Sequence, residues 1–123
     1  MTPTSELQKP IIKTELPGPK GREIIAADEK YVTPSYPRPD YKLVAEKGYG
    51  VWIEDADGNV FLDCNAGVAV CSTGHCHPET VEAITKQAQT LIHMCGTDFY
   101  YRQMPDLGKK LNEICPIEGD TKT

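Results

Sequence analysis

Hydrophobic and polar residues alternate on both sides of a short Asp-Gly-Asn turn at residues 57–59. The apolar positions that this alternation places on one face of the strands, or at its edge, are Val51, Ile53, Val60 and Leu62. An Asp-Gly pair between two alternating runs is a strong signal for a tight hairpin turn. The pattern therefore predicts a hairpin of two antiparallel strands.

A third alternating run lies just before this hairpin. Its two sets of positions are Tyr41, Leu43 and Ala45 on one side and Lys42, Val44 and Glu46 on the other. The run predicts an edge strand over residues 41–47 that leads into a turn at Gly48-Tyr49-Gly50. Together the three strands predict a small antiparallel sheet, which needs cover on its apolar face.

Helical periodicity is clearest after Pro78, a residue that suits the first position of a helix because it has no N–H group to leave unpaired. Apolar residues recur there every three or four positions, at Val81, Ile84, Ala88, Leu91 and Ile92. The pattern predicts a helix from Pro78 to about His93 whose apolar stripe is a core face. Similar spacing predicts a short amphipathic helix within residues 20–31 and another helix that starts at Pro105.

The remaining segments predict loops and a division of the chain into four parts. Residues 1–16 have no apolar periodicity, which is typical of a flexible arm or an extended strap. The small, glycine-bearing passage at residues 65–70 is too short for a stable helix alone, so something must pack closely against it. The predicted parts are an arm at 1–16, a helix and Pro-rich strap at 17–40, a three-stranded sheet with a pocket loop at 41–77, and helices at 78–123. The predicted fold class is therefore α+β.

Composition and charge exclude several functional classes. The chain has 123 residues, of which 39% are hydrophobic and 7% aromatic, so its core is modest and needs a partner surface. A net charge of −5, from 18 acidic and 13 basic residues, argues against nucleic acid as a ligand. No run approaches the roughly 20 apolar residues that span a bilayer, and the N-terminus has no signal-peptide pattern. These features predict a cytoplasmic protein that does not bind membranes.

The cysteines indicate reduced thiols. There are five of them, an odd number, with no Cys-x-x-Cys spacing and no secretory signal. A free cysteine is usually a small buried hydrophobic residue. A structural metal site remains an alternative because Cys71 and His75 have a spacing that zinc ligands use, although Cys76 and His77 are adjacent and cannot easily join them. Packed cysteines and a turn-forming histidine are the simpler interpretation.

Three motifs between Gly50 and Pro78 make a family recognisable. They read aromatic-x-x-Asp-x-Asp-Gly-Asn at residues 52–59, Leu-Asp-x-x-x-Gly-x-Ala-Val at residues 62–70, and Gly-His-x-His-Pro at residues 74–78. This arrangement resembles class III pyridoxal-phosphate-dependent aminotransferases, most of all the 4-aminobutyrate, ornithine and acetylornithine group. The segment Thr-Glu-Leu-Pro-Gly-Pro-Lys at residues 14–20 looks like archaeal members of the 4-aminobutyrate type. Because such enzymes are several times longer, the resemblance implies an N-terminal fragment of a fold-type I enzyme, which is α/β when complete.

The resemblance assigns roles to three side chains. Val68 would form an apolar wall of the substrate pocket, and Tyr100 would present a phenol at its mouth. Thr97 matches a position that approaches the cofactor phosphate in some relatives. The alternative for Phe99 and Tyr100 is that they only fill a core. For Asp63 the resemblance gives no chemical role, and its place after a strand favours a carboxylate that caps a turn.

The resemblance places the catalytic machinery outside this segment. The family's Schiff-base lysine, the aspartate on the pyridine nitrogen and the phosphate-binding turn would all follow downstream, and no lysine here lies in the corresponding motif. Lys86 has polar neighbours on a solvated helix face, which does not suit a Schiff-base amine. We therefore expect no catalytic residue in this chain, and no activity from it alone.

The complete protein, on this resemblance, would use pyridoxal 5'-phosphate to move an amino group from an amino acid or ω-amino acid to a 2-oxo acid. It would act as a homodimer or higher homo-oligomer. Two alternatives stay open. One is a free-standing, non-enzymatic module that dimerises or binds metal through Cys71 and His75. The other is a racemase or aminomutase with the same cofactor, because neither Val68 nor Tyr100 fixes the reaction outcome.

Overall fold

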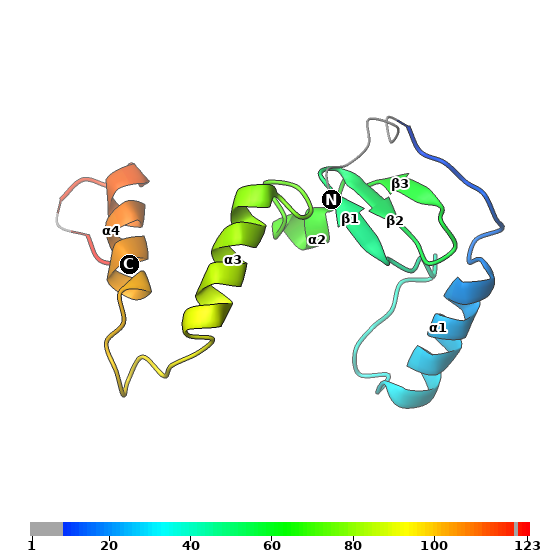
Figure 1. Cartoon of the computed structure of the whole chain (residues 1–123), viewed down its shortest axis with the longest axis horizontal. Coiled ribbons are helices and arrows are strands. Elements are labelled where there is room, and N and C mark those ends of the chain that lie inside the picture. Colours follow the sequence, from blue (N-terminus) through cyan, green and yellow to red (C-terminus); the bar gives the residue numbers. More distant parts are fainter. Residues whose placement is uncertain (1–8, 120) are drawn as a thin grey trace. The chain divides into compact units, whose positions relative to one another are not determined.

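The computed structural model describes residues 9–119 and 121–123, so half of the predicted arm at 1–16 lies outside the described residues. The chain divides into two compact units, Met1–Ala83 and Ile84–Thr123. The first contains helix α1 (Pro19–Tyr31), strands β1 (Lys47–Tyr49), β2 (Trp52–Glu54) and β3 (Val60–Leu62), and the short turn α2 (Ala66–Ala69). Helix α3 (Pro78–Thr90) contains the boundary, and helix α4 (Gln103–Ile114) lies in the second unit (Figure 1).

The strands form one antiparallel sheet in the order β1-β2-β3, which confirms the predicted small sheet with helices. The prediction of an edge strand over residues 41–47 was wrong, because β1 begins only at Lys47. Lys47 pairs with Glu54, the last residue of β2 before the hairpin loop. Residues before Glu46 therefore have no length of β2 left to pair with, and alternation without a partner does not make a strand.

The register of the hairpin also differs from the expected one. Ile53 pairs with Phe61 and Glu54 with Val60, so Ile53 and Val60 point to opposite faces of the sheet. The backbone hydrogen bond from Asp55 N to Asn59 O (2.9 Å) closes a loop of three residues, 56–58. Gly58, the third of them, adopts a φ of 81°. A three-residue loop with a left-handed third residue shifts the register relative to a two-residue turn.

Asn59 ties the N-terminal strap to this hairpin. Its Oδ1 accepts hydrogen bonds from the backbone N–H groups of Lys13 (2.6 Å) and Thr14 (3.0 Å), and its Nδ2 donates to Thr14 Oγ1 and Asp55 Oδ2. Ile11 adds a pair of backbone bonds to Val60, at 2.9 and 2.7 Å. Among the described residues, Val60 is the one buried apolar side chain, and Asn59 beside it is 0% exposed. The centre of this unit is therefore largely a hydrogen-bond network.

Asp57, in the hairpin loop, caps the N-terminus of α1. Its carboxylate accepts hydrogen bonds from Lys20 N (3.0 Å) and Gly21 N (2.8 Å), two donors of the first helical turn. A methyl group at Gly18 would overlap this carboxylate, so the helix start lies directly against the loop. The hairpin loop thus replaces the local capping residue that the Pro-Gly-Pro sequence at residues 17–19 does not supply.

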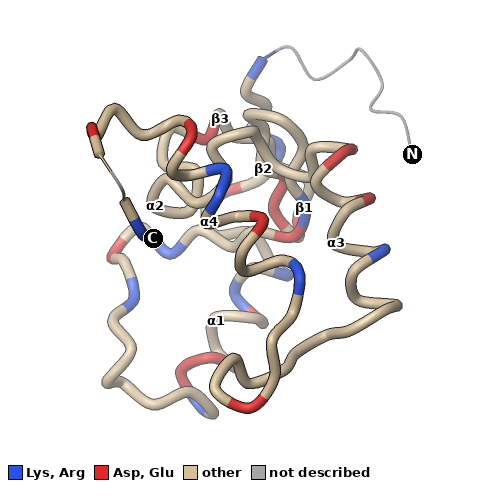
Figure 2. Tube along the Cα trace, turned by 90° about the vertical axis from the view of Figure 1, so that its left-hand side faces the viewer, with Lys and Arg blue, Asp and Glu red and all other residues tan. Residues whose placement is uncertain are grey.

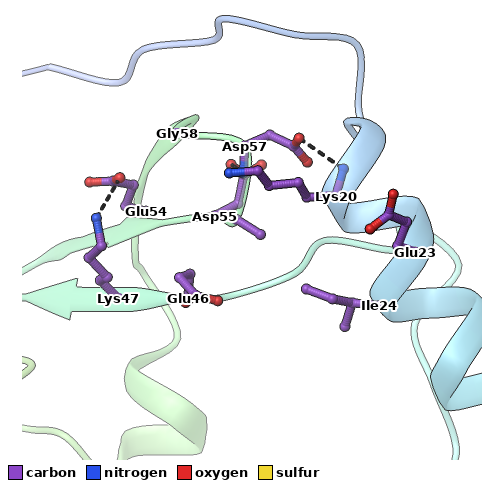
Figure 3. Close-up of a pocket in the computed structure, with 10 residues that line it drawn as sticks. Lys20, Glu23, Ile24, Glu46, Lys47, Glu54, Asp55, Asp57 and Gly58 are labelled. Atoms are coloured by element: carbon purple, nitrogen blue, oxygen red, sulfur yellow. Dashed lines mark hydrogen bonds and ion pairs between the residues drawn. The ribbon is translucent and has the colours of Figure 1, made fainter.

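A hollow of about 620 Å³ lies between α1 and the hairpin. Figure 3 shows side chains from both elements at its edge: Lys20, Glu23 and Ile24 from α1, and Glu54, Asp55 and Asp57 from the hairpin. Three of its carboxylates already have partners: Glu54 pairs with Lys47 (2.9 Å), Asp55 bonds Asn59, and Asp57 caps the helix. Of these three carboxylates, Asp57 joins α1 to the hairpin, whereas the contacts of Glu54 and Asp55 stay within the sheet and its hairpin loop.

Stability should depend on pH through Asp57. Desolvation raises the pKa of this carboxyl, but the N–H groups of Gly21 and Lys20 and the nearby charges outweigh it and hold the pKa below its ordinary value of 3.8. A depressed folded-state pKa stabilises the fold above the unfolded value, and this contribution is lost as pH falls through it. We expect Asp57→Asn to lower the urea midpoint of Trp52 fluorescence at pH 6 and to lower it less at pH 3. A difference that stays constant over this range would contradict the prediction.

Helix α3 begins at Pro78, as predicted, but the end of α3 and the start of α4 differ from the predictions. Helix α3 ends at Thr90 and not near His93; the Gln87 side chain donates to the Leu91 carbonyl (2.8 Å) and caps this end. Helix α4 begins two residues before Pro105, which is compatible with proline because the first N–H groups of a helix have no intrahelical acceptor. The apolar stripe of α3 was expected to be a core face, but Val81 is 46% and Ile84 63% exposed. That expectation was wrong for this chain.

The surface carries both charges. Figure 2 shows Lys and Arg interspersed with Asp and Glu along the trace. In the described part of the chain, no helix has both the length and the hydrophobicity required to cross a bilayer.

Candidate functional site

Within the passage at residues 65–70, the four residues 66–69 fold into a left-handed turn. The φ angles of Ala66, Gly67, Val68 and Ala69 are 51°, 64°, 61° and 62°. Ala69 N donates to Asn65 O (2.9 Å) and Cys71 N donates to Ala66 O (2.9 Å). Left-handed backbone costs roughly 1–2 kcal/mol for each residue other than glycine, and a β-branched residue such as Val68 is a genuine outlier there. Such strain persists where the surroundings determine the conformation, and it is concentrated at functional sites.

Val68, the predicted pocket wall, lies in the middle of this turn and is 82% exposed. Val70 follows with 80% of its surface exposed. In the described part of the chain, no atom apart from the neighbouring residues and the backbone of the turn itself comes within 4 Å of a methyl group built on Gly67. The expectation that something packs closely against this passage is therefore not met within this chain. Two exposed apolar side chains therefore lie at this turn, Val68 on left-handed backbone and Val70 just after it, where the backbone is right-handed again.

Asp63 caps the start of the turn, as its place after β3 predicted. Its Oδ1 accepts hydrogen bonds from Asn65 N (2.8 Å) and Ala66 N (3.0 Å). The Asn65 N–H group, the His75 side chain and the Ala66 N–H group lower the pKa of Asp63 below its ordinary value of 3.8. The carboxylate is therefore ionised at neutral pH and acts as an acceptor only.

His75 is the functional-site residue that the sequence did not single out as a partner of Asp63. Its Nε2 lies 2.6 Å from Asp63 Oδ2, and its backbone makes two 2.8 Å hydrogen bonds with Gly50. The only sequence signal for the pair is that Asp63 and His75 flank the small-residue passage. The metal-binding alternative would need this imidazole, and no three His, Cys, Asp or Glu side chains come together in a metal-binding arrangement within residues 9–119 and 121–123.

Thr97, the predicted cofactor contact, lies in an exposed loop of the second unit. Its hydroxyl is 3.0 Å from Cys95 Sγ and 3.5 Å from Asp98 Oδ1. Hydrogen bonds from the Thr97 side chain and backbone lower the pKa of the Cys95 thiol. The loop begins at Leu91, directly after α3 ends at Thr90. The N–H groups of Asp98 and Phe99 in this loop donate to the Cys95 carbonyl, at 3.0 and 3.2 Å.

Tyr100 lies in the same loop as Thr97 and is fully exposed. Phe99 beside it is 62% exposed, so neither ring fills a core in this chain. A hollow of about 690 Å³ in this unit is lined by Phe99, Tyr100, Tyr101, Met104 and their neighbours. The structure thus brings Thr97 and Tyr100 together in one loop, whereas Val68 belongs to the other unit.

The cysteines contradict one expectation. All five are free thiols in the described structure, but Cys64, Cys76, Cys95 and Cys115 are exposed, and Cys71 is half-buried. They were expected to be buried as small hydrophobic residues. The described residues bury one apolar side chain only, so there is no core large enough to take them.

The residues present fit a pyridoxal cofactor only in part. The exposed Thr97 hydroxyl is a donor of the kind that a phosphate oxygen accepts, whereas the N–H groups of Asp98 and Phe99 already bond the Cys95 carbonyl. A Schiff-base lysine is usually activated by desolvation or by a neighbouring cation. Every lysine of the chain, Lys86 included, is exposed. The described residues therefore offer one hydroxyl donor but no lysine in an environment that suits covalent attachment.

Comparison with known proteins gives one consistent result. The family model "Aminotransferase class-III" matches residues 35–122. An alanine/serine racemase from Pyrococcus horikoshii is 36% identical over 113 residues, which is 92% of this chain and 24% of the racemase. An acetylornithine aminotransferase from Methanothermobacter thermautotrophicus is 44% identical over 94 residues, 76% of this chain and 23% of that enzyme.

The solved structures agree with the sequence matches. The ornithine aminotransferase from Toxoplasma gondii, crystallised in the presence of oxidised glutathione and described with partial occupancy of PLP, matches with a TM-score of 0.68 and 31% identity. The match covers 76% of this chain and 21% of that structure. The chain thus spans about a quarter of the length of the relatives that it matches.

Proposed function

Because this chain belongs to the class III aminotransferase family, we propose that it is the N-terminal part of an enzyme that transfers an amino group from an amino acid or ω-amino acid to a 2-oxo acid. The observation that carries the proposal is the continuous family match over residues 35–122. Relatives named acetylornithine or ornithine aminotransferase support this substrate class. The bound pyridoxal 5'-phosphate would act as the electron sink for the reaction.

Within this proposal the chain provides binding surface and no covalent chemistry. Its lysines are exposed, so the lysine that holds the cofactor would come from the rest of the protein. Val68 would line the part of the pocket that holds the apolar portion of the substrate, and Tyr100 would offer a phenol O–H to its polar end. Thr97 would donate to the cofactor phosphate. The 123-residue chain alone would then be inactive, and the complete cytoplasmic enzyme would be a homodimer or higher homo-oligomer.

Amino-acid racemisation is a second candidate. It is supported by the racemase relative, which matches 92% of this chain, more than the acetylornithine aminotransferase does. Racemisation and transamination share the cofactor and the labile substrate proton, and they differ in where that proton returns. Val68 and Tyr100 fit either outcome, because an apolar pocket wall and a phenol contact do not determine which carbon is protonated.

The proposal is tested on the complete protein encoded with this segment. It is incubated with N-acetylornithine, ornithine or 4-aminobutyrate and a 2-oxo acid, and the new amino acid is quantified. L-alanine and L-serine are incubated separately, and their D-isomers are measured by chiral chromatography. We expect amino transfer. Racemisation without transfer would replace the proposal by its alternative, and neither activity would overturn both.

Borohydride reduction locates the covalent chemistry. The complete protein is reduced in the presence of pyridoxal phosphate, digested and analysed by mass spectrometry. We expect a stoichiometric lysine adduct outside this segment and only nonspecific labelling of the purified 123-residue chain. A stoichiometric adduct at one lysine of this chain would show that the segment holds the cofactor covalently.

Val68→Trp should obstruct the pocket in the complete enzyme. The bulky ring would take the space of the apolar part of the substrate, so KM should rise at least about tenfold while the bound cofactor keeps its visible absorbance. Val70→Trp is the control, because it adds the same ring to the neighbouring exposed valine. Normal kinetics in Val68→Trp would remove Val68 from the site.

Tyr100→Phe tests the phenol separately. If the O–H group contacts the substrate, its loss should lower kcat/KM about five- to tenfold, the effect of one hydrogen bond of about 1 kcal/mol or slightly more. It should also change the relative rates for different amino donors. Tyr36→Phe, at another exposed tyrosine, is the control. Unchanged donor preference would indicate that Tyr100 only packs against the rest of the enzyme.

A further inference from the structure

Asp63 and His75 hold the two ends of one loop. Asp63 follows β3 and binds the first N–H groups of the turn, Asn65 N and Ala66 N, through Oδ1. His75 is fixed to the sheet by paired 2.8 Å backbone bonds with Gly50. The 2.6 Å contact between Asp63 Oδ2 and His75 Nε2 joins these two anchors across the loop. The side chains are 8% and 20% exposed, so water has little access to the contact.

The loop that this contact closes contains the left-handed turn at Ala66–Ala69. Three of these four residues are not glycine, yet all have φ angles between 51° and 64°. A turn of this kind does not keep its conformation by itself, because ordinary residues favour the right-handed region. In the described part of the chain nothing apart from the neighbouring residues and the backbone of the turn itself lies within 4 Å of a methyl group built on Gly67, and Val68 and Val70 are exposed. The valine side chains therefore have little cover, and the contacts that bound the turn are its own backbone bonds and the anchors at its two ends.

The ring of His75 is itself fixed in orientation. A methyl group built on Gly48 would come within 2.7 Å of His75 Cγ and 3.1 Å of Nδ1, so the imidazole lies directly against Gly48 of β1. The low pKa of Asp63 keeps the carboxylate ionised and an acceptor, which places the shared proton on His75 Nε2. The donor, His75 Nε2, is held through the backbone bonds of His75 to Gly50, and the acceptor, Asp63 Oδ2, is held by the position of Asp63 after β3.

From this geometry we propose that Asp63 and His75 form a clamp that fixes the left-handed turn at Ala66–Ala69 and thereby positions Val68 against the substrate. Both are positioning residues, because they act through Val68 and do not touch the reacting atoms. The link to substrate rests on the proposed function. The clamp itself does not, because it follows from the contacts at the two ends of the turn.

The clamp is tested by hydrogen exchange in the complete protein. His75→Leu removes the donor and should speed amide exchange at Ala69 and Cys71, whose N–H groups close the turn, at least about tenfold. His75→Gln keeps an N–H donor of similar reach and should restore most of the protection. If His75→Leu does not fold, Asp63→Asn provides the second variant, since it keeps an acceptor for Asn65 and Ala66 but loses the charge that faces His75. Unchanged exchange in these variants would overturn the clamp.

The positioning role is tested by kinetics. A pocket wall contributes equally to ground-state and transition-state binding, so His75→Leu should raise KM about tenfold with kcat within about threefold, and His75→Gln should reverse the change. In a Val68→Ala background, His75→Leu should change KM less than about twofold, because the side chain through which it acts is already gone. Equal effects in both backgrounds would overturn the role in substrate binding. A wild-type enzyme without transfer or racemisation would overturn the proposed function instead, and hydrogen exchange would still decide whether the clamp exists.

Discussion

Replacing Asn59 with leucine should lower the free energy of unfolding of the first unit by about 3–5 kcal/mol. The Asn59 side chain makes four hydrogen bonds. Its Oδ1 accepts two, from the N–H groups of Lys13 and Thr14, and its Nδ2 donates two, to Thr14 Oγ1 and Asp55 Oδ2. Leucine has a similar volume but satisfies none of these partners. Asp55, itself 6% exposed, would lose the amide donor on Oδ2, and a buried carboxylate oxygen without a donor is especially costly.

The measurement uses Trp52, which is the only tryptophan of the chain and lies in β2. Urea unfolding followed by its fluorescence reports on the unit that contains Asn59. The matched control is Asn65→Leu, whose side chain is exposed and makes no capping bond to α2 in the described structure. It should change stability by less than about 0.5 kcal/mol. Similar losses in both variants would mean that leucine is disfavoured in general and that the Asn59 network is not the cause.

The central role of Asn59 illustrates what the sequence predicts and what it leaves open. Alternation around Asp-Gly was enough to predict the hairpin, because that pair favours the left-handed conformation that the turn requires. It was not enough to predict the register. The loop has three residues, 56–58, and one residue more in a loop moves every later side chain to the other face of the sheet. The contacts from Asn59 to the strap join residues 45 and 46 positions apart, which no local pattern encodes.

The helices also show a limit of prediction from local sequence. Periodicity predicted α3 and α4, but it cannot say what covers an apolar stripe. Ile84 and Leu107 are 63% and 61% exposed, as surfaces that need a partner would be. The relatives are between three and four times as long as this chain, and that difference in length agrees with apolar faces that this chain does not cover.

The candidate site was predictable in its parts. The position of Asp63 after a strand predicted a capping carboxylate, and the structure confirms it. The partnership with His75 was missed because a contact between two side chains 12 residues apart depends on how the intervening turn folds. Val68, Tyr100 and Thr97 stay predictions about the complete enzyme, since they come from a family resemblance and not from a local pattern.

Gly48→Ala should destabilise the first unit by about 2–3 kcal/mol and open the loop that Asp63 and His75 close. The added methyl would come within 2.7 Å of His75 Cγ and 2.8 Å of its Cβ. The imidazole cannot simply turn aside, because its backbone pairs with Gly50 and its Nε2 contacts Asp63. Either β1 or His75 must move, and both movements stretch the bonds that anchor the turn. Trp52 fluorescence in urea measures the stability, and amide exchange at Gly50 reports the loss of its bond to His75.

Gly108→Ala separates this specific overlap from the general effect of a methyl group. Gly108 lies inside α4, and within the described residues nothing lies within 4 Å of the position of the new methyl. Alanine should stabilise that helix by roughly 0.5–1 kcal/mol, because glycine loses more backbone entropy on folding. The same chemical change is thus expected to have opposite signs at two glycines. An unchanged Trp52 midpoint in Gly48→Ala would show that the His75 ring is free to move, and the ring would then be too loosely held to position Val68.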